Sequence, residues 1–376
     1  TVLAEDPGHD VESVILDPYD RRAVGVVVGS LPETRRWLDP QTAALRARLA
    51  QAFPGRTVAV GGRSRDGQRL LVGVSSPAHA PVHYLVDLAN RTADVVGETY
   101  PALVDVPLGE VRAISYAARD GTEIPALLTI PPGTDGRNLP LVVMPHGGPE
   151  ARDTYAFDWW VQFLATRGYA VLQPQFRGSI GLGRAFREAG HGQWGGLMQH
   201  DVTDGVKAMI AQGIADPRRV CIVGASYGGY AALAGATMTP ELYACAASVN
   251  GIADLPMMLG HENRDRSTDG SAYWRERIGS VFDRTLGDRS PARLVARVRA
   301  PVLLLHGADA VVVPIAQSET MARALKLAGK AHEFVRLPGE DHWLSRAETR
   351  TRVLQELDVF LARHLNPAGA AGPASN

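Results

Sequence analysis

The sequence predicts an α/β fold, in which a mostly parallel sheet flanked by helices follows a smaller β-rich segment. In residues 109–366, apolar strand-like runs alternate with helical patterns, which is typical of a parallel sheet built from βαβ units. Residues 1–108 instead contain short alternating runs separated by turn signals such as Asp17-Pro18 and Asp66-Gly67. The chain of 376 residues is 45% hydrophobic, so it can bury one large core or two smaller ones.

The composition excludes several classes of protein. Lys plus Arg numbers 39 and Asp plus Glu 40, a formal net charge of -1, whereas a nucleic-acid binder usually carries a basic surplus. No stretch reaches about 18 apolar residues, so we expect no membrane-spanning segment.

The chain opens at Thr1 with neither Met nor a leader pattern. We therefore expect that a leader or a larger piece has been removed, and the compartment stays unknown.

The two cysteines, Cys221 and Cys245, both lie in apolar runs. We expect free buried thiols rather than a disulfide, because unpaired cysteine behaves as a small apolar residue. No zinc site can be built from this pair.

The β-rich segment, residues 1–108, has the hairpin spacing of propeller blades or of part of a sandwich. One helix is expected after Asp39-Pro40, where a cap precedes a proline at the first helical position. Five or so strands cannot close a propeller, so we expect this segment to pack against something that the chain does not contain. The strand-like runs are residues 12–16, 23–28, 57–60, 69–74 and 82–88.

The α/β segment, residues 109–366, follows a change of character after Pro107. Its strand-like runs are residues 124–130, 139–144, 169–172, 220–223, 244–249, 302–305 and 332–337. Its helical patterns are residues 157–167, 205–212, 227–238, 317–327 and 348–365. The tail, residues 367–376, consists mainly of Pro, Ala, Gly and Ser, and we expect it to be disordered.

The strongest chemical signal is Gly224-Ala225-Ser226-Tyr227-Gly228, between a buried strand and a helical pattern. A G-x-S-x-G sequence in that context is a nucleophile elbow, a turn so tight that small residues must flank the serine. The alternative is a glycine-rich turn that merely needs positive φ. The strand and the helix on either side favour Ser226 as a nucleophile.

A hydrolase of this type also needs an oxyanion hole, two N–H donors that stabilise the negative charge of the transition state. One donor is expected to be the main-chain N–H of Tyr227, directly after the nucleophile. The other is expected from Gly148 or Gly147 in the His146-Gly147-Gly148-Pro149 loop, which follows the strand at 139–144. The alternative for this loop is a simple turn before a helix.

The general base is expected to be His342, in the loop between the last strand and the final helix. The chain order serine, then acid, then histidine is the one this fold uses. The only rival is His306, which ends a strand and for which we expect a structural role.

These motifs together resemble the peptidase domain of the prolyl oligopeptidase family, in its acylaminoacyl-peptidase branch. The resemblance covers about residues 111–365 and includes Phe176-Arg177-Gly178-Ser179, Gln193-Trp194-Gly195, Ser290-Pro291, Leu305-His306-Gly307 and Gly339-Glu340-Asp341-His342. It implies an α/β-hydrolase fold, preceded by the C-terminal portion of a β-propeller in residues 1–108.

The resemblance fails at the acid of the catalytic triad. The family's acid is the aspartate of His-Gly-x-x-Asp-x-x-Val-Pro, but residues 306–314 here read HGADAVVVP. Ala310 therefore occupies the acid position, and Asp309 lies one residue early. Three explanations stay open: an engineered Asp→Ala replacement that cripples the enzyme, a natural inactive relative, or Asp309 acting as a shifted acid.

The resemblance implies a serine peptidase that hydrolyses short or acylated peptides through an acyl-enzyme on Ser226, crippled at Ala310. A carboxylesterase of the same fold and a catalytically dead peptide-binding module are the alternatives. No metal or organic cofactor is implied, because this route of hydrolysis needs neither. The expected partners are a small peptide substrate and a propeller fragment upstream of Thr1, since exposed strand edges invite pairing; homo-oligomer formation stays open.

Four further residues are candidates for substrate binding. His146 lies in the oxyanion loop, and Arg177 follows a central strand, where a structural salt bridge is the alternative. Tyr273 and Trp274 fall in a stretch, residues 255–282, that is expected to line an apolar specificity pocket beside Ser226.

Overall fold

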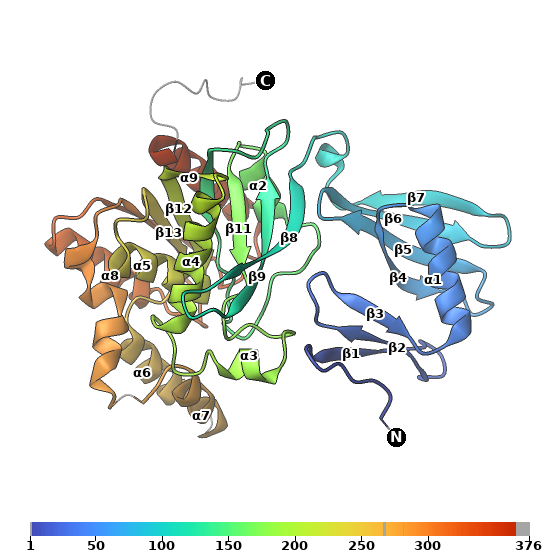
Figure 1. The fold of residues 1–376 in the computed structure, drawn as a ribbon, viewed down its shortest axis with the longest axis horizontal. Helices are drawn as coiled ribbons and strands as arrows, with labels where there is room; N and C mark the ends of the chain where they lie inside the picture. The colour runs from blue at the N-terminus through green and yellow to red at the C-terminus, as the bar shows by residue number, and fades with distance from the viewer. Residues whose placement is uncertain (1, 266–267, 281, 366–376) are drawn as a thin grey trace.

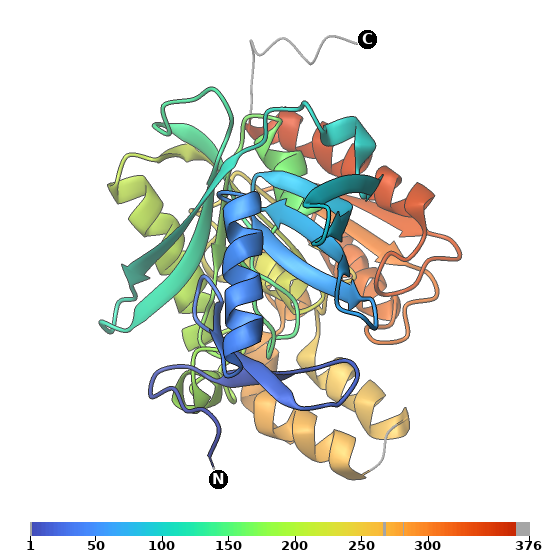
Figure 2. The same ribbon diagram turned by 90° about the vertical axis from the view of Figure 1, so that its right-hand side faces the viewer.

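The computed structural model describes residues 2–265, 268–280 and 282–365. The tail for which disorder was expected, residues 367–376, lies outside the described residues. Figure 1 shows a large part built around one sheet and, beside it, a smaller part that carries the first seven strands and one helix. Figure 2, viewed from the side of the smaller part, shows the small part in front of the large one.

The large part is built on an eight-stranded sheet with the order β15-β14-β13-β12-β10-β11-β9-β8. The pairs β8–β9 and β9–β11 are antiparallel, and the other five neighbouring pairs are parallel. The strands are β8 (Glu110–Ala117), β9 (Glu123–Ile130), β10 (Leu139–Val143), β11 (Ala170–Pro174), β12 (Ala215–Ala225), β13 (Cys245–Val249), β14 (Val302–Gly307) and β15 (His332–Leu337).

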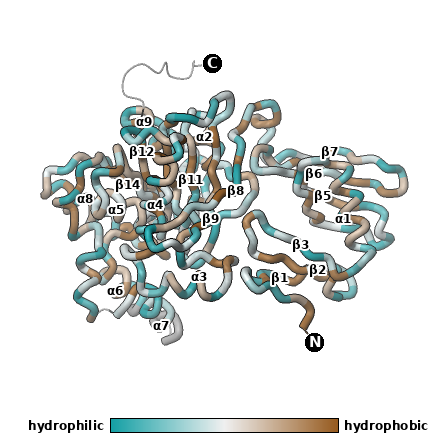
Figure 3. Tube along the Cα trace, in the orientation of Figure 1, coloured by the Kyte–Doolittle hydropathy of each residue, from teal (hydrophilic) through white to brown (hydrophobic). Residues whose placement is uncertain are grey.

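Helices cover both faces of this sheet, which explains why its central strands are continuously apolar. On β12, Val220 and Ile222 pack in the cluster that includes α4 and α5, whereas Val223 packs in the cluster that includes α2 and α9. The interior strands of the large sheet carry much of the hydrophobic colouring in Figure 3. The helices are α2 (Trp159–Ala165), α3 (Arg184–Glu188), α4 (Leu197–Ala211), α5 (Tyr227–Met238), α6 (Leu255–Asp265), α7 (Thr268–Arg277), α8 (Ala316–Leu327) and α9 (Ala347–Leu365), with short 3-10 helices at Arg284–Arg289, Pro291–Arg293 and Val295–Arg297. Within the described residues, no helix is long and apolar enough to cross a membrane.

The expectation of two free thiols was wrong, because Cys221 and Cys245 form a disulfide. The two residues are register partners on the neighbouring parallel strands β12 and β13. Their Cα atoms are 4.7 Å apart, within the range that a disulfide can bridge. Both strands look like ordinary buried strands in the sequence, so only their pairing register brings the two sulfur atoms together.

The smaller part contains two antiparallel sheets and one helix. Its helix α1 (Pro40–Ala52) begins where expected, with the Asp39 carboxylate capping the Thr42 N–H. The second sheet runs in the order β4-β5-β6-β7, a four-stranded meander consistent with one propeller blade. The strands are β1 (Val11–Leu16), β2 (Ala23–Val28) and β3 (Thr34–Trp37) in the first sheet, and β4 (Thr57–Arg63), β5 (Arg69–Ser76), β6 (His79–Asp87) and β7 (Thr92–Glu98) in the second; a 3-10 helix at Pro101–Leu103 follows.

The two faces of the β4–β7 sheet have different surroundings. On one face Leu49 of α1 packs with a buried cluster that includes Leu70 and Val72. On the other face Leu71 and Leu85 are cross-strand partners and remain 45% and 39% exposed. A contiguous apolar pair on an open face is what a neighbouring blade would cover.

Arg152 joins the two parts of the molecule. Its guanidinium, almost buried, donates to Glu12 Oε2 at 2.7 Å and to Glu33 Oε1 at 2.8 Å. Nearby, the Asp10 main-chain N–H donates to Gly181 O at 3.0 Å, and the Gly181 N–H donates to Asp10 Oδ2 at 3.0 Å. The β1–β3 sheet is therefore docked on the loops that follow β10 and β11, the same end of the sheet that carries the site described next.

Candidate active site

Ser226 lies at a sharp turn between β12 and α5. Its φ of 58° is in the left-handed region, which is rare for a residue with a side chain and marks a held, strained turn. The turn is fixed by the Ser226 N–H, which donates to Val249 O of β13 at 2.9 Å.

The glycines around Ser226 are required by space. A Cβ atom on Gly224 would lie 2.3 Å from Gly228 O, and one on Gly228 would lie 2.0 Å from Pro145 O. Both contacts are with main-chain atoms, which cannot rotate away as the end of a side chain can. The G-x-S-x-G sequence therefore follows from the close approach of β12, α5 and the loop after β10.

His342 meets Ser226 across 116 residues of sequence. Its Nε2 is 3.1 Å from Ser226 Oγ, so the hydroxyl can donate to the ring when the imidazole proton is on Nδ1. Burial lowers the pKa of His342 below its usual value, and the charge of Asp341 partly opposes that shift. A neutral imidazole beside a serine hydroxyl is the arrangement a general base needs.

The other ring nitrogen of His342 has no hydrogen-bond partner among the residues that the structure describes. Nδ1 is buried and makes no hydrogen bond within the described residues. Ala310, whose side chain offers no acceptor, is only 6% exposed, whereas Asp309 is exposed and contributes its main-chain N–H to Glu340 O at 3.0 Å. The structure thus gives no support to Asp309 as a shifted acid.

The carboxylates of Glu340 and Asp341, next to His342 in sequence, are also committed elsewhere. Glu340 Oε1 accepts the Asp341 N–H at 2.9 Å. Asp341 accepts the Trp343 N–H at 2.9 Å and the Ser345 hydroxyl at 2.6 Å. Within the described residues, neither carboxylate accepts a hydrogen bond from His342 Nδ1.

His306 has the structural role that was expected. Its Nε2–H donates to Val313 O at 2.9 Å, and its Nδ1 is 2.7 Å from Ser318 Oγ. Burial lowers its pKa to about 4, so the ring stays neutral. Because His306 and Val313 lie on either side of Ala310 in the sequence, the hydrogen bond between them closes the loop that contains Ala310.

The loop expected to supply an oxyanion donor lies beside the nucleophile. An ideal Cβ on Gly147 would be 3.5 Å from Ser226 Cβ, and Gly148 has a φ of +119° that favours glycine. Tyr227, as the first residue of α5, has a main-chain N–H with no acceptor inside the helix. The two expected donors thus belong to segments that meet at Ser226.

His146 supports this loop instead of facing a substrate. Its Nδ1–H donates to Gly147 O at 2.7 Å, and Nε2 lies 2.9 Å from Ser179 Oγ. The ring stacks on Phe176 with centroids 4.3 Å apart, and burial lowers its pKa to about 4. Both ring nitrogens are occupied, so the expectation that His146 binds substrate gives way to a positioning role.

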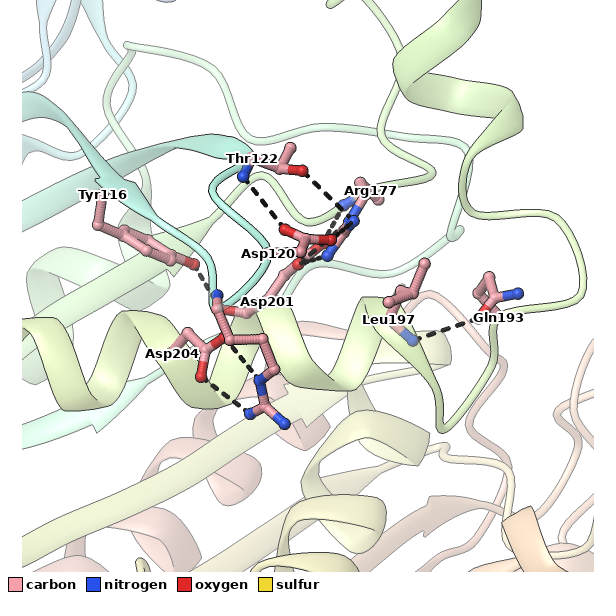
Figure 4. Close-up of polar contacts among 9 residues, drawn as sticks. Tyr116, Asp120, Thr122, Arg177, Gln193, Leu197, Asp201 and Asp204 are labelled. Atoms are coloured by element: carbon pink, nitrogen blue, oxygen red, sulfur yellow. Dashed lines mark hydrogen bonds and ion pairs between the residues drawn. The ribbon is translucent and has the colours of Figure 1, made fainter.

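Arg177 likewise takes the structural alternative. Its guanidinium donates to Asp201 Oδ1 at 2.6 Å and to Asp120 Oδ2 at 2.5 Å, as the close-up shows (Figure 4). Both the Arg177 and Asp201 side chains are nearly inaccessible. A buried arginine with two carboxylate partners has no free donor edge to offer a substrate, so the substrate-binding expectation is corrected here.

Tyr273 and Trp274 of α7 lie in different environments. Trp274 is buried, with its ring centroid 6.3 Å from that of Trp194, which in turn packs edge-on against Tyr227 at 4.6 Å. Tyr273 is partly exposed, and the Arg277 guanidinium lies 3.7 Å from its ring centroid. Trp274 therefore contributes to the aromatic cluster behind Tyr227.

Two residues that the sequence did not single out connect these loops. Glu150, just after the glycine loop, lies 2.9 Å from both the Arg277 and the His191 side chains. Although burial raises its pKa, hydrogen bonds from these two partners hold it below its usual value. Asn250 donates a hydrogen bond to the main-chain O of His342. The sequence carries a signal for a special turn at this residue, because an Asn-Gly pair directly follows an apolar strand and such a pair favours positive φ.

No group of three or more His, Cys, Asp or Glu side chains that could hold a metal ion gathers in the part of the chain described by the structure.

Comparisons with known proteins agree with this geometry. A model of the prolyl oligopeptidase family matches residues 155–368. Dipeptidyl aminopeptidase BIII of Pseudoxanthomonas mexicana is 32% identical over 99% of this chain and 55% of its own length. The acylamino-acid-releasing enzyme of Rattus norvegicus is 29% identical over 69% of this chain and 36% of its own.

A solved structure of a puromycin hydrolase matches with a TM-score of 0.74 and 30% identity, over 92% of this chain and 52% of that one. The chain thus spans about half the length of this hydrolase and of the aminopeptidase, and 36% of the acylamino-acid-releasing enzyme. The family model, the two relatives and the solved structure indicate the same family. The chain belongs to the prolyl oligopeptidase family, and its eight-stranded sheet with flanking helices is the α/β-hydrolase domain of that family.

Proposed function

We propose that this chain carries the catalytic domain of a serine peptidase that hydrolyses short or acylated peptides, with Ala310 in place of the triad's acid. The hydrogen bond between His342 Nε2 and Ser226 Oγ, on a strained elbow, is the observation that carries the proposal. The named relatives, an aminopeptidase and an acylamino-acid-releasing enzyme, support peptides as the substrate class.

In the proposed reaction His342 Nε2 takes the proton of Ser226 as Oγ attacks the scissile carbonyl carbon. The N–H groups of Tyr227 and of Gly147 or Gly148 stabilise the oxyanion that forms. His342 returns the proton to the leaving amine, which leaves an acyl-enzyme on Ser226. His342 then takes a proton from water as the water attacks the acyl-enzyme ester. The carboxylic acid product is released, and Ser226 is restored with its proton returned by His342.

Ala310 makes this reaction slow. The acid of a triad accepts the Nδ1–H, holds the productive tautomer and stabilises the imidazolium that forms during attack. His342 Nδ1 has no such acceptor within the described residues. In other serine hydrolases the loss of this carboxylate lowers kcat about 10⁴-fold, while the oxyanion hole and substrate binding still contribute.

A carboxylesterase and a dead peptide-binding module remain the competing functions. A fluorophosphonate probe separates an enzyme from a dead module, because it reacts only with an activated serine. Labelling of Ser226 that increases in Ala310→Asp and vanishes in Ser226→Ala supports an enzyme. Relative rates on an acylamino-acid anilide and a p-nitrophenyl ester then separate peptidase from esterase.

The pH dependence of labelling follows from the state of His342. Because burial lowers its pKa below the usual 6.5 and only the neutral ring accepts the Ser226 proton, labelling should rise with pH through a midpoint below about 6.5 and then level off. In Ala310→Asp the new carboxylate stabilises the imidazolium, so the midpoint should move to higher pH. A pH series of probe labelling measures both midpoints, and an unchanged midpoint would contradict contact between residue 310 and His342.

We further propose that additional propeller blades cover the open face of the β4–β7 sheet at Leu71 and Leu85. The support is that exposed apolar pair, together with relatives about twice as long as this chain. A companion chain of propeller sequence is expected in denaturing mass spectrometry of the purified protein. A single species near 40.3 kDa would argue against it.

A further inference from the structure

Asn250 lies directly after β13, where three loops of the site converge. It is 1% exposed and has a φ of 49°. Its Nδ2 donates to His342 O at 2.9 Å and approaches Asp341 O at 3.5 Å, and its Oδ1 accepts the Gly307 N–H at 2.8 Å. The orientation of the carboxamide is unambiguous, because a main-chain N–H needs an acceptor and a carbonyl needs a donor.

The loops that Asn250 joins are those of the base and of the acid position. An ideal Cβ on Gly307 would lie 2.6 Å from Asp341 O, so the loop after β14 and the loop after β15 are in close main-chain contact. The Asn250 N–H donates to Leu305 O at 2.9 Å, which fixes Asn250 to β14. One buried side chain therefore ties the end of β14 to the main chain of His342.

The His342 ring has few other restraints. Nε2 contacts Ser226 Oγ, and Nδ1 has no acceptor within the described residues. Where no carboxylate holds the ring, its position depends on where the His342 main chain is held. A misplacement of the base by a fraction of an ångström is costly, because proton transfer requires hydrogen-bond geometry.

We propose that Asn250 is a positioning residue for His342: its carboxamide sets the main chain of the base relative to Ser226. This role rests on the proposed function, because it matters only if His342 acts as base toward Ser226. The proposal also predicts that the effect of replacing Asn250 depends on residue 310. A carboxylate there would hold the His342 ring through Nδ1, so the loss of the Asn250 hydrogen bond would have a smaller effect.

Asn250→Asp tests this with little change of shape. The variant keeps an oxygen for the Gly307 N–H and tolerates left-handed φ. It replaces the donor that faces His342 O with an acceptor, so an attraction becomes a repulsion. Asn138→Asp is the matched control, because Asn138 has the same φ of 49° and lies exposed before β10.

The experiment is a double-mutant cycle of Asn250→Asp and Ala310→Asp, read as the rate of Ser226 labelling by a fluorophosphonate. In the Ala310 background, Asn250→Asp should slow labelling about tenfold, because a shifted His342 main chain moves Nε2 out of line with the Ser226 hydroxyl. In the Ala310→Asp background the loss should be smaller, and steady-state assays should show lowered kcat with unchanged KM. Asn138→Asp should leave every rate unchanged.

The outcomes distinguish the two hypotheses. If the parent is labelled and Asn250→Asp reacts as fast as Asn138→Asp, the role of Asn250 is overturned and the proposed function is not. The same holds if Asn250→Asp loses the same factor in the Ala310 and Ala310→Asp backgrounds. Absence of Ser226 labelling even in Ala310→Asp would overturn the proposed function and this role with it. Urea unfolding midpoints check that each variant is folded. If Asn250→Asp is not folded, Asn250→Gly repeats the comparison, because glycine adopts this φ without a side-chain partner.

Discussion

Replacing Ala310 by aspartate is expected to raise kcat/KM on an acylamino-acid anilide by about three orders of magnitude or more. Ala310 is buried in the loop after β14, which contacts the loop of His342 through the Asp309 N–H and Glu340 O. His342 Nδ1 is buried and makes no hydrogen bond to any described residue. A carboxylate introduced there would accept the Nδ1–H and stabilise the imidazolium of the transition state. Steady-state assays of both proteins on the anilide and on a p-nitrophenyl ester measure the gain.

Ala308→Asp is the matched control, since it makes the same substitution two residues earlier, at an exposed position. No gain is expected from it. Asp309→Ala should also leave the rate unchanged, because Asp309 is exposed and contributes only its main-chain N–H. If Ala310→Asp gives no gain on either substrate while Asp309→Ala lowers the rate, Asp309 is the acid and our assignment of position 310 is wrong.

Gly228→Ala is expected to destabilise the domain by about 3 kcal/mol and to abolish labelling of Ser226. Alanine is normally the better helix former by about 1 kcal/mol, so helix propensity alone predicts the opposite sign. The steric argument prevails because the new Cβ would lie 2.0 Å from Pro145 O, a main-chain atom directly before the glycine loop. Relieving that clash moves the oxyanion donors away from the nucleophile.

Urea unfolding and probe labelling measure the two effects of Gly228→Ala separately. Gly97→Ala is the control, because a Cβ there would meet open space and its φ is not positive. The control should retain the parent's stability and labelling. A stable, fully labelled Gly228→Ala protein would show that the elbow tolerates side chains and that its glycines are not required by space.

Much of the site could be predicted from the sequence because its determinants are local. The turn at Ser226 requires glycines within two residues on either side, and a strand and a helix must adjoin it directly. The central strands of the large part follow from apolar periodicity, since a strand buried on both faces must be apolar throughout. Helices α3, α6 and α7 were not predicted from the sequence. Strands β3, β7 and β8 were missed for the converse reason: they carry polar or exposed residues that give no such signal.

The roles of Arg177 and His146 could not be assigned from the sequence. A side chain after a central strand can face a substrate or a buried carboxylate, and the choice depends on residues far away. Asp120, which accepts from Arg177, is 57 residues distant, and Ser179, beside His146 Nε2, is 33 residues distant.

The sequence by itself determined the fold class, and it predicted the nucleophile, the base and the substituted acid position, since each is written in contiguous residues or in their order. The tertiary structure alone decided the disulfide between Cys221 and Cys245 and the placement of Asn250. It also decided that His342 Nδ1 is buried without a hydrogen-bond partner among the described residues. These depend on the register of neighbouring strands and on how their C-terminal loops meet. A shift of one residue in register would separate such contacts while leaving every local pattern unchanged.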